Sequence, residues 1–431
     1  MLGSGRQRGD NHGVQRSPVR TPALSVLAGG IAVLALIGAA VLWPSGARRP
    51  EVPALSSFEG IYTATTIERT ERACTGGDAS TRCLSLRFRL LEGPDEGQVV
   101  PIELSAETSR FDALHVGRRV LLGHQPAVEG FEYVFLDPDR RSSLLTLAGI
   151  FAIGVIALGR WRGASALVGL IATLLVLFLF MVPAILDGRD PLLVSLVGSV
   201  VIAFSALYLS HGINAQTTVA LIGTLGGLAC AALFAVAFMD LAEITGLASE
   251  EALFLTALGT NIDLRGLILG GMMVGALGAI DDVTVTQSSA VWELRAVDAT
   301  RSRSQLLSSG LRIGRDHVAS TVNTLVLAYA GASMPLLVLF LLSDQSAGTV
   351  ANGEIVATEI VRTLVGSIGL IASVPITTWL AVDAVTRAGR HQAVAAPRER
   401  GDAAGPEEHA IPDRRRDVWF GLYRNWRARR R

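Results

Sequence analysis

Eight apolar segments recur along the sequence, each close to the run of about 20 apolar residues that crosses a bilayer as a helix. They cover residues 23–43, 143–160, 164–186, 192–210, 217–239, 264–291, 317–343 and 359–386. Hydrophobic residues make up 50% of the chain and charged residues only 18%, a balance too apolar for a soluble globular protein. We therefore predict an α-helical polytopic membrane protein with about eight transmembrane helices.

Arginines in the short connections predict how these spans are oriented. Two connections are rich in arginine, with Arg160, Arg162, Arg295, Arg301, Arg303, Arg312 and Arg315. The connections at 187–191 and 344–358 contain only Arg189. Because arginine is concentrated in cytoplasmic loops, we expect a multi-pass protein of the cell membrane with both termini in the cytoplasm.

The remaining segments outside the main bundle are assigned by composition. Residues 1–22 would form a cytoplasmic tail and 23–43 a signal-anchor helix, because no short apolar region with a cleavage site is present. The bundle of seven further helices covers 143–386. The segment 249–260 is too short to cross and starts like a capped helix. Residues 387–431 form a basic tail, either disordered or in contact with anionic lipid headgroups.

The segment 48–141 is long enough to be translocated whatever its own charges, so we expect it to be extracytoplasmic. Five stretches in it are rich in β-forming residues and are separated by Gly, Pro and Asp: 60–66, 83–90, 98–104, 119–123 and 131–136. This pattern predicts a small extracytoplasmic β domain, an OB-like barrel or a sandwich.

Three cysteines occur, and their spacing is not that of a zinc or thiol redox site. Cys230 lies in an apolar run and is expected to be a packed thiol. Cys74 and Cys83 lie in the polar segment, with Gly76 and Gly77 between them. We predict a disulfide between Cys74 and Cys83 if this segment faces an oxidising compartment.

A stripe of small and polar residues follows the sixth predicted span. At about 100° per residue, one face carries Gly271, Gly275, Gly278, Asp282, Thr286, Ser289 and Glu293. The glycines permit close helix packing, and the oxygen-bearing side chains continue the same line toward the cytoplasm. A face of this kind is typical of a polar path through a membrane.

Asp281 and Asp282 are the residues of this span that need explanation. Each unpaired charge at such a depth costs about 2.5–3.5 kcal/mol on insertion scales. The seventh span offers partners on one face, namely Asp316, Ser320, Asn323 and Thr324. Oxygen ligands suit a proton or a hard cation. The alternatives are a carboxylate simply hydrogen-bonded to a neighbouring helix and an Asn323 that clasps two helices.

Several function classes are disfavoured by the sequence. The 38 basic and 38 acidic residues cancel, so no excess of positive charge points to nucleic acid. Walker, HExxH and GxSxG patterns are lacking, so we expect neither an enzyme nor a cofactor, and the pattern does not identify a metal. The expected partners are the lipid bilayer and a small cation or proton, and a homo-oligomer is compatible with the glycine face.

Two consecutive stretches, GGMMVGALGAIDDVTVTQSSAVWEL and SGLRIGRDHVASTVNTLVLAYAGASMPLLVLF, resemble the YibE/F-like family of bacterial multi-spanning membrane proteins. The resemblance implies a bacterial inner-membrane protein but no particular substrate. Its pattern corresponds to Gly278, Ala279, Asp282, Glu293, Gly314, Arg315, Asp316, Asn323 and Thr324. Asp281 stands where the family has an apolar residue, which favours Asp282 as the shared position.

Two functions compete at this point. The first is a transporter or permease that moves a cation, a proton or a proton-coupled small solute between the sixth and seventh spans. The second is a non-transporting scaffold or sensor whose extracytoplasmic domain binds a ligand or envelope partner. The polar stripe favours the first function, and the domain of about 90 residues favours the second.

Overall fold

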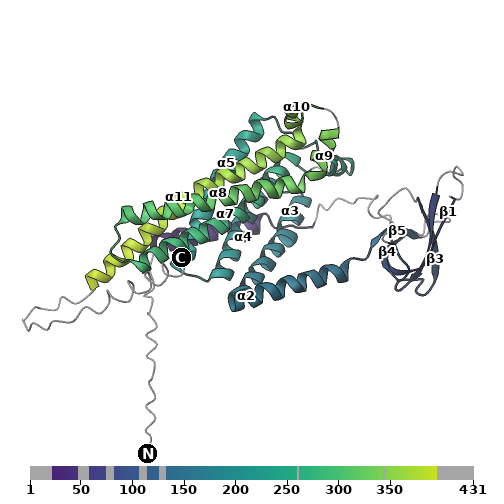
Figure 1. Ribbon diagram of the computed structural model, residues 1–431, viewed down its shortest axis with the longest axis horizontal. Coiled ribbons are helices and arrows are strands. Elements are labelled where there is room, and N and C mark those ends of the chain that lie inside the picture. Colours follow the sequence, from purple (N-terminus) through teal and green to yellow (C-terminus); the bar gives the residue numbers. More distant parts are fainter. Residues whose placement is uncertain are drawn as a thin grey trace, which may run out of the picture. The chain divides into compact units, whose positions relative to one another are not determined.

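The structure is a computed structural model that describes residues 22–46, 58–73, 82–105, 114–125, 133–259, 262–342 and 345–395 (Figure 1). The predicted tails lie outside these residues, apart from Pro22 and residues 387–395, which belong to helices. Cys74 lies outside them as well.

Twelve helical segments occur in the described part of the chain. They are α1 (Pro22–Val41), α2 (Arg141–Leu175), the π-helix η2 (Val176–Met181), α3 (Val182–Leu186), α4 (Pro191–His211), α5 (Ala215–Leu241), α6 (Glu250–Ala257), α7 (Leu264–Val297), α8 (Arg303–Ala332), α9 (Met334–Leu342), α10 (Ala347–Asn352) and α11 (Glu354–Ala395). Helix α11 contains Pro375 in its interior. Helix α6 occupies the short segment that was predicted to begin as a capped helix.

Local side-chain chemistry explains where several helices begin. The Asp190 carboxylate accepts a hydrogen bond from the Leu193 amide (2.8 Å), with Pro191 in the first helical position of α4. Asn214 and Ser249 cap α5 and α6 in the same way. These side chains satisfy amides that the first turn of a helix leaves without an intrahelical partner.

Helix α2 is interrupted where the sequence predicts a connection between two spans. Arg160 has φ 52° and ψ −129°, which is not helical. A Cβ on Gly163 would lie 2.2 Å from the Val155 carbonyl oxygen, so the chain can turn back tightly only with glycine there. The turn separates the two apolar halves of this segment.

Six helical segments among the described residues are long and apolar enough to cross a membrane. They are α1, the run from α2 to α3, α4, α5, α7 and α11. A seventh is obtained if α8 and α9, which are bent by 63° at their junction, form one span. The chain is therefore a mostly helical protein with several apolar spans, and the run Arg141–Leu186 is counted once despite its break at Arg160.

Five antiparallel strands form one small curled sheet. They are β1 (Gly60–Ala73), β2 (Arg82–Leu90), β3 (Val99–Ser105), β4 (Arg119–His124) and β5 (Tyr133–Pro138), in the order β3-β2-β1-β4-β5. Each strand overlaps one of the five predicted stretches. The register of β1 against β2 shifts between Thr66 and Glu68, an irregularity that increases the local bend of a strand.

Alternation along β2 produces the core of this sheet. Leu84, Leu86, Phe88 and Leu90 are buried, whereas Arg87 and Arg89 between them are exposed, as expected for a strand with one buried face. The Phe88 ring stacks on Phe135 at a centroid distance of 6.3 Å. Cys83 is disulfide-bonded.

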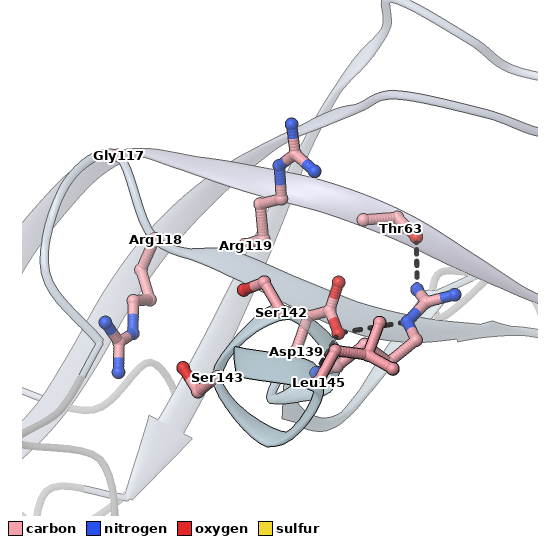
Figure 2. Close-up of a pocket in the computed structure, with 9 residues that line it drawn as sticks. Thr63, Gly117, Arg118, Arg119, Asp139, Ser142, Ser143 and Leu145 are labelled. Carbon is pink, nitrogen blue, oxygen red and sulfur yellow. Dashed lines mark hydrogen bonds and ion pairs between the residues drawn. The ribbon is translucent and has the colours of Figure 1, made fainter. Parts of the chain in front are cut away.

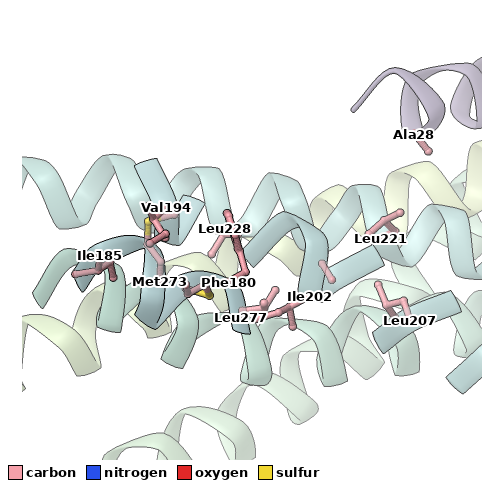
Figure 3. Packing of buried hydrophobic residues seen from close by; sticks show 13 residues of the cluster. Ala28, Phe180, Ile185, Val194, Ile202, Leu207, Leu221, Leu228, Met273 and Leu277 are labelled. Atoms are coloured by element: carbon pink, nitrogen blue, oxygen red, sulfur yellow. The ribbon is translucent and has the colours of Figure 1, made fainter. Parts of the chain in front are cut away.

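The helices pack around two large apolar clusters and a smaller third one, which joins α5, α7, α8 and α11. One cluster joins η2, α3, α4, α5 and α7 and includes Ala28 of α1 (Figure 3). Its buried side chains include Phe180, Ile202, Leu228 and Leu277. The second cluster joins α5, α7 and α11 and includes Met239, Met272, Ile280 and Leu370. Helix α7 contributes to all three clusters, so it is the central helix of the bundle.

Helices α5 and α11 approach each other through glycines. A Cβ on Gly227 would lie 2.9 Å from the Gly369 carbonyl oxygen, and a Cβ on Gly369 would lie 2.9 Å from the Gly227 carbonyl oxygen. A Cβ on Gly223 would meet the Thr377 hydroxyl. Small residues at these positions allow the backbones to come close, which also brings polar side chains of neighbouring helices within bonding distance.

Candidate functional site

Helix α7 turns a polar face toward the interior of the bundle. Thr284, Gln287 and Ser288 are almost completely buried and lie one turn apart or side by side on the face that also carries Ile280 and Val291. Polar groups in such surroundings are stable when they are hydrogen-bonded. Their partners therefore define the site.

Gln287 connects three helices. Its Nε2 donates to the Gly310 carbonyl oxygen of α8 (2.8 Å) and to the Thr378 hydroxyl of α11 (2.7 Å). A Cβ on Gly314 would lie 3.0 Å from Gln287 Oε1, so a glycine is needed there for α8 to approach. The oxygen Oε1 is buried and has no hydrogen-bond partner in the described part of the chain.

A second polar contact joins α5 and α7 one turn away. The hydroxyls of Thr224 and Thr284 are 2.6 Å apart, and both side chains are fully buried. Thr224 is also close enough to interact with the Asp281 carboxyl group. Asp281 Oδ1 is buried and accepts no hydrogen bond from any described residue. The inward-facing carboxylate of α7 is thus Asp281.

Asp282 lies about 100° further around α7 than Asp281 and is exposed. The predicted stripe residues Gly271, Gly275, Gly278, Asp282, Thr286 and Glu293 are exposed in the single chain. Ser289 is half-buried, and its hydroxyl accepts a hydrogen bond from Gln216 Nε2 (2.5 Å). Within the described residues, no hydrogen bond joins the Asp282 carboxylate to α8.

The predicted partners on α8 are exposed too. Asp316, Ser320, Asn323 and Thr324 all lie on the open side of that helix. The two exposed faces meet where Thr286 Oγ1 lies 3.1 Å from His317 Nδ1. A Cβ on Gly275 would lie 2.7 Å from the Tyr329 hydroxyl. The predicted stripes of α7 and α8 are therefore neighbours, joined through His317 and Tyr329, which sequence reasoning had not selected.

Other residues of the buried site were also missed. Gln287 stands between Thr286 and Ser288, and nothing local distinguishes it from a surface amide. Thr224, Thr377 and Thr378 are hydroxyl residues in apolar helices, where they usually bond their own backbone. The sequence does contain an indication of close contacts between these helices, because small residues are typical of positions where helices approach each other. These residues are Gly223, Gly226, Gly227, Gly310, Gly314 and Gly369.

The polar side chains of this site are suited to bind a proton or a hard cation. No group of three or more His, Cys, Asp or Glu side chains that could hold a metal ion occurs in the part of the chain that the structure describes. The buried groups are hydroxyls, one amide and one carboxylate. Hydroxyl and carboxylate oxygens transfer protons or bind hard cations.

Comparison with known proteins gives one match. The family model described as YibE/F-like protein matches residues 147–387, which is more than half of the chain. The matched region contains α7, α8 and the buried polar groups around Asp281 and Gln287. Neither the curated proteins nor the solved structures include a match to the chain.

Proposed function

Because the chain belongs to the YibE/F-like family and is a membrane protein with several apolar helices, we propose that it is a transporter or permease for a proton or a hard cation. The path would run along α7, with Asp281 and Asp282 at its centre. In this proposal the protein carries out no chemical reaction and needs no cofactor.

The carboxylate of the half-buried Asp281 is the observation that carries the proposal. One of its oxygens is buried and accepts no hydrogen bond from the described residues. A charged side chain inside a bilayer costs about 2.5–3.5 kcal/mol on insertion scales. Binding a proton or a cation removes most of this cost. A group that must be neutralised in this way is suited to load and release the transported ion.

The two adjacent carboxylates give the ion a route across α7. Consecutive helix residues point about 100° apart, so Asp281 faces α5 while Asp282 faces the open side. From Asp282 the exposed Thr286 and Asp316 and the half-buried His317 continue toward the end of α7. An ion released from Asp281 would pass to Asp282 and then along this line.

A second copy of the chain would cover the open side. Asp282 and Asn323 are exposed in the single chain, and neither side chain is stable against lipid. Gly271 and Gly278 have no atom within 4 Å of the position of a Cβ, so this face can receive another helix closely. A homo-oligomer packed through α7 and α8 would enclose the path between two copies.

The number of spans, the location of the termini and the fold of the β domain are part of the same proposal. The break at Arg160 and the bent pair α8–α9 support eight spans, with both termini in the cytoplasm of a bacterial cell and the sheet outside it. The order β3-β2-β1-β4-β5 supports an OB-like barrel, because β3 and β5, the two edges of the curled sheet, approach each other.

Flux in proteoliposomes tests the transport proposal. Purified protein would be reconstituted with a pH-sensitive dye inside, and a panel of cations would be applied under an imposed gradient. Asp281→Asn and Asp282→Asn should each lower flux by at least tenfold without lowering the yield of folded protein. The matched control Asp298→Asn changes a carboxylate that follows α7 and should leave flux unchanged.

Two results would contradict the proposal. One is full flux in both Asp281→Asn and Asp282→Asn. The other is the absence of flux above protein-free vesicles for every ion in the panel. The second result would favour the scaffold or sensor, whose ligand site would then be sought in the β domain.

A further inference from the structure

A cavity of about 480 Å³ lies where the β domain continues into α2 (Figure 2). Its wall combines the start of β4 with the first turn of α2 and includes Arg118, Arg119, Arg141, Ser142 and Ser143. Asp139 is the one carboxylate among the residues that line it. No group of the proposed ion path takes part in this cavity.

The positive charges of the cavity are not balanced within it. The Arg141 guanidinium donates to the Asp139 carboxylate (3.0 Å) and to the Thr63 hydroxyl (2.8 Å). Hydrogen bonds from the Arg141 backbone amide and from its guanidinium hold the pKa of Asp139 below its usual range, so Asp139 is ionised and neutralises Arg141. Arg118 and Arg119 form no ion pair with any residue that the structure describes. Two guanidinium groups are therefore available to an anion.

The first turn of α2 adds donors of a second kind. Arg140 precedes the helix without a side-chain capping bond, and the first turn contains no acidic residue. The hydroxyls of Ser142 and Ser143 face the cavity, as Figure 2 shows. Hydroxyls together with guanidinium forks are the groups that hold phosphate in proteins.

The neighbouring residues place the cavity at the surface of the lipid. Leu144, Leu145, Leu147 and Ile150 are 61%, 73%, 64% and 63% exposed in the single chain. This helix presents exposed apolar side chains on all sides, as expected of a membrane span. The cavity opens directly before this apolar stretch, and Leu145 lines it. Its depth is therefore that of the lipid headgroups.

We propose that this cavity binds the phosphate of an anionic phospholipid headgroup in the leaflet on the side of the β domain. Arg118 and the serines of α2, which lie on the same side in Figure 2, bind the phosphate, Arg119 adds positive charge to the same wall, and Leu145 contacts the glycerol and acyl region. A lipid bound in this way would fix the β domain to the membrane surface. The proposal does not depend on whether the protein transports an ion.

Native mass spectrometry of the full chain in detergent tests this site. Phosphatidylglycerol and phosphatidylcholine would be titrated separately, and inorganic phosphate would form a third arm. The double variant Arg118→Gln/Arg119→Gln removes two arginines at a membrane surface, so its affinity for phosphatidylglycerol should fall about thirtyfold. The control Arg87→Gln/Arg89→Gln removes two exposed arginines from β2 of the same sheet and should keep that affinity.

Each result decides for or against the site. Preference for phosphatidylglycerol that is lost only in the Arg118/Arg119 variant supports it. Equal binding of the two lipids, or equal loss in both double variants, overturns it. Competition by inorganic phosphate without any lipid preference would indicate a site for a soluble anion and would also overturn it. If the Arg118/Arg119 variant does not fold, phosphatidylglycerol binding by the unchanged protein must still weaken as salt rises.

Discussion

Replacing Gly369 by alanine should destabilise the helical bundle. The new Cβ would lie 2.7 Å from Ala231 Cβ, 2.9 Å from the Gly227 carbonyl oxygen and 3.1 Å from Ile280 Cδ1. Two of these neighbours belong to α5, and one of them is backbone, so α5 and α11 must move apart. Inserting a methyl group into a packed core costs about 1–3 kcal/mol. Alanine regains about 1 kcal/mol through helix propensity, which leaves a net loss of about 0–2 kcal/mol.

The matched control is Gly154→Ala in α2. Gly154 also lies inside an apolar helix, but no atom lies within 4 Å of the position of its Cβ. Only the gain in helix propensity applies there, so the two variants should differ by about 1–3 kcal/mol in the free energy of unfolding. Thermal unfolding in one detergent, followed by tryptophan fluorescence, measures the difference. A Gly369→Ala protein that melts at or above the temperature of Gly154→Ala would refute the close approach of α5 and α11.

Two further predictions concern polar groups. Gln287→Leu removes two buried hydrogen bonds and should lower the free energy of unfolding by about 1 kcal/mol, measurable in the same assay; an unchanged melting temperature would argue against the bonds to α8 and α11. Hydrogen bonds from the Thr63 hydroxyl and amide lower the pKa of Glu92 in the folded protein. The ionised Glu92 therefore contributes fully to stability above the ordinary glutamate pKa of about 4.3. This contribution is lost as the pH falls through the lower pKa of the folded state. The protection of the β1 amides against hydrogen exchange, corrected for the intrinsic exchange rate at each pH, should therefore decrease on acidification in the natural protein, and this loss of protection should be weaker in Glu92→Gln.

Local periodicity predicted most of the elements. In β2, apolar residues alternate with arginines, and this alternation is visible in the sequence before any contact is known. The turn at Arg160 falls between two apolar runs, where Arg160 and Arg162 already indicated a connection. Such features depend on neighbours a few residues apart, so they can be read from a single sequence.

The rotation of α7 could not be predicted in the same way. A Cβ on Gly270 would meet the Ser195 side chain, whereas Gly271 has open space beside it, yet both are the same residue type. Asp281 and Asp282 are likewise the same residue type and differ only in the direction in which their side chains point from the helix axis. When small and polar residues occur on both faces of a helix, the sequence gives little information about which face is packed.

The buried hydrogen bonds of α7 depend on distant parts of the chain. Gln287 donates a hydrogen bond to Thr378, which is 91 residues away in the sequence. Helix α8 can approach the Gln287 side chain only because it has glycines at the contact positions. Pairings of this kind are set by tertiary packing and have no local signal. Sequence reasoning therefore selected the carboxylates and overlooked the amide that joins α7, α8 and α11.

Pro375 gives α11 a point of low bending stiffness beside this amide. Proline has no N–H, so the Ile371 carbonyl oxygen has no hydrogen bond from the residue four positions later, and the proline ring crowds that oxygen. This turn of α11 therefore has one backbone hydrogen bond fewer than an uninterrupted helix, which lowers its resistance to bending. The angle between the segments of α11 before and after Pro375 can thus change. Such a change would move Thr378 relative to Gln287 while the ends of the helix keep their own contacts.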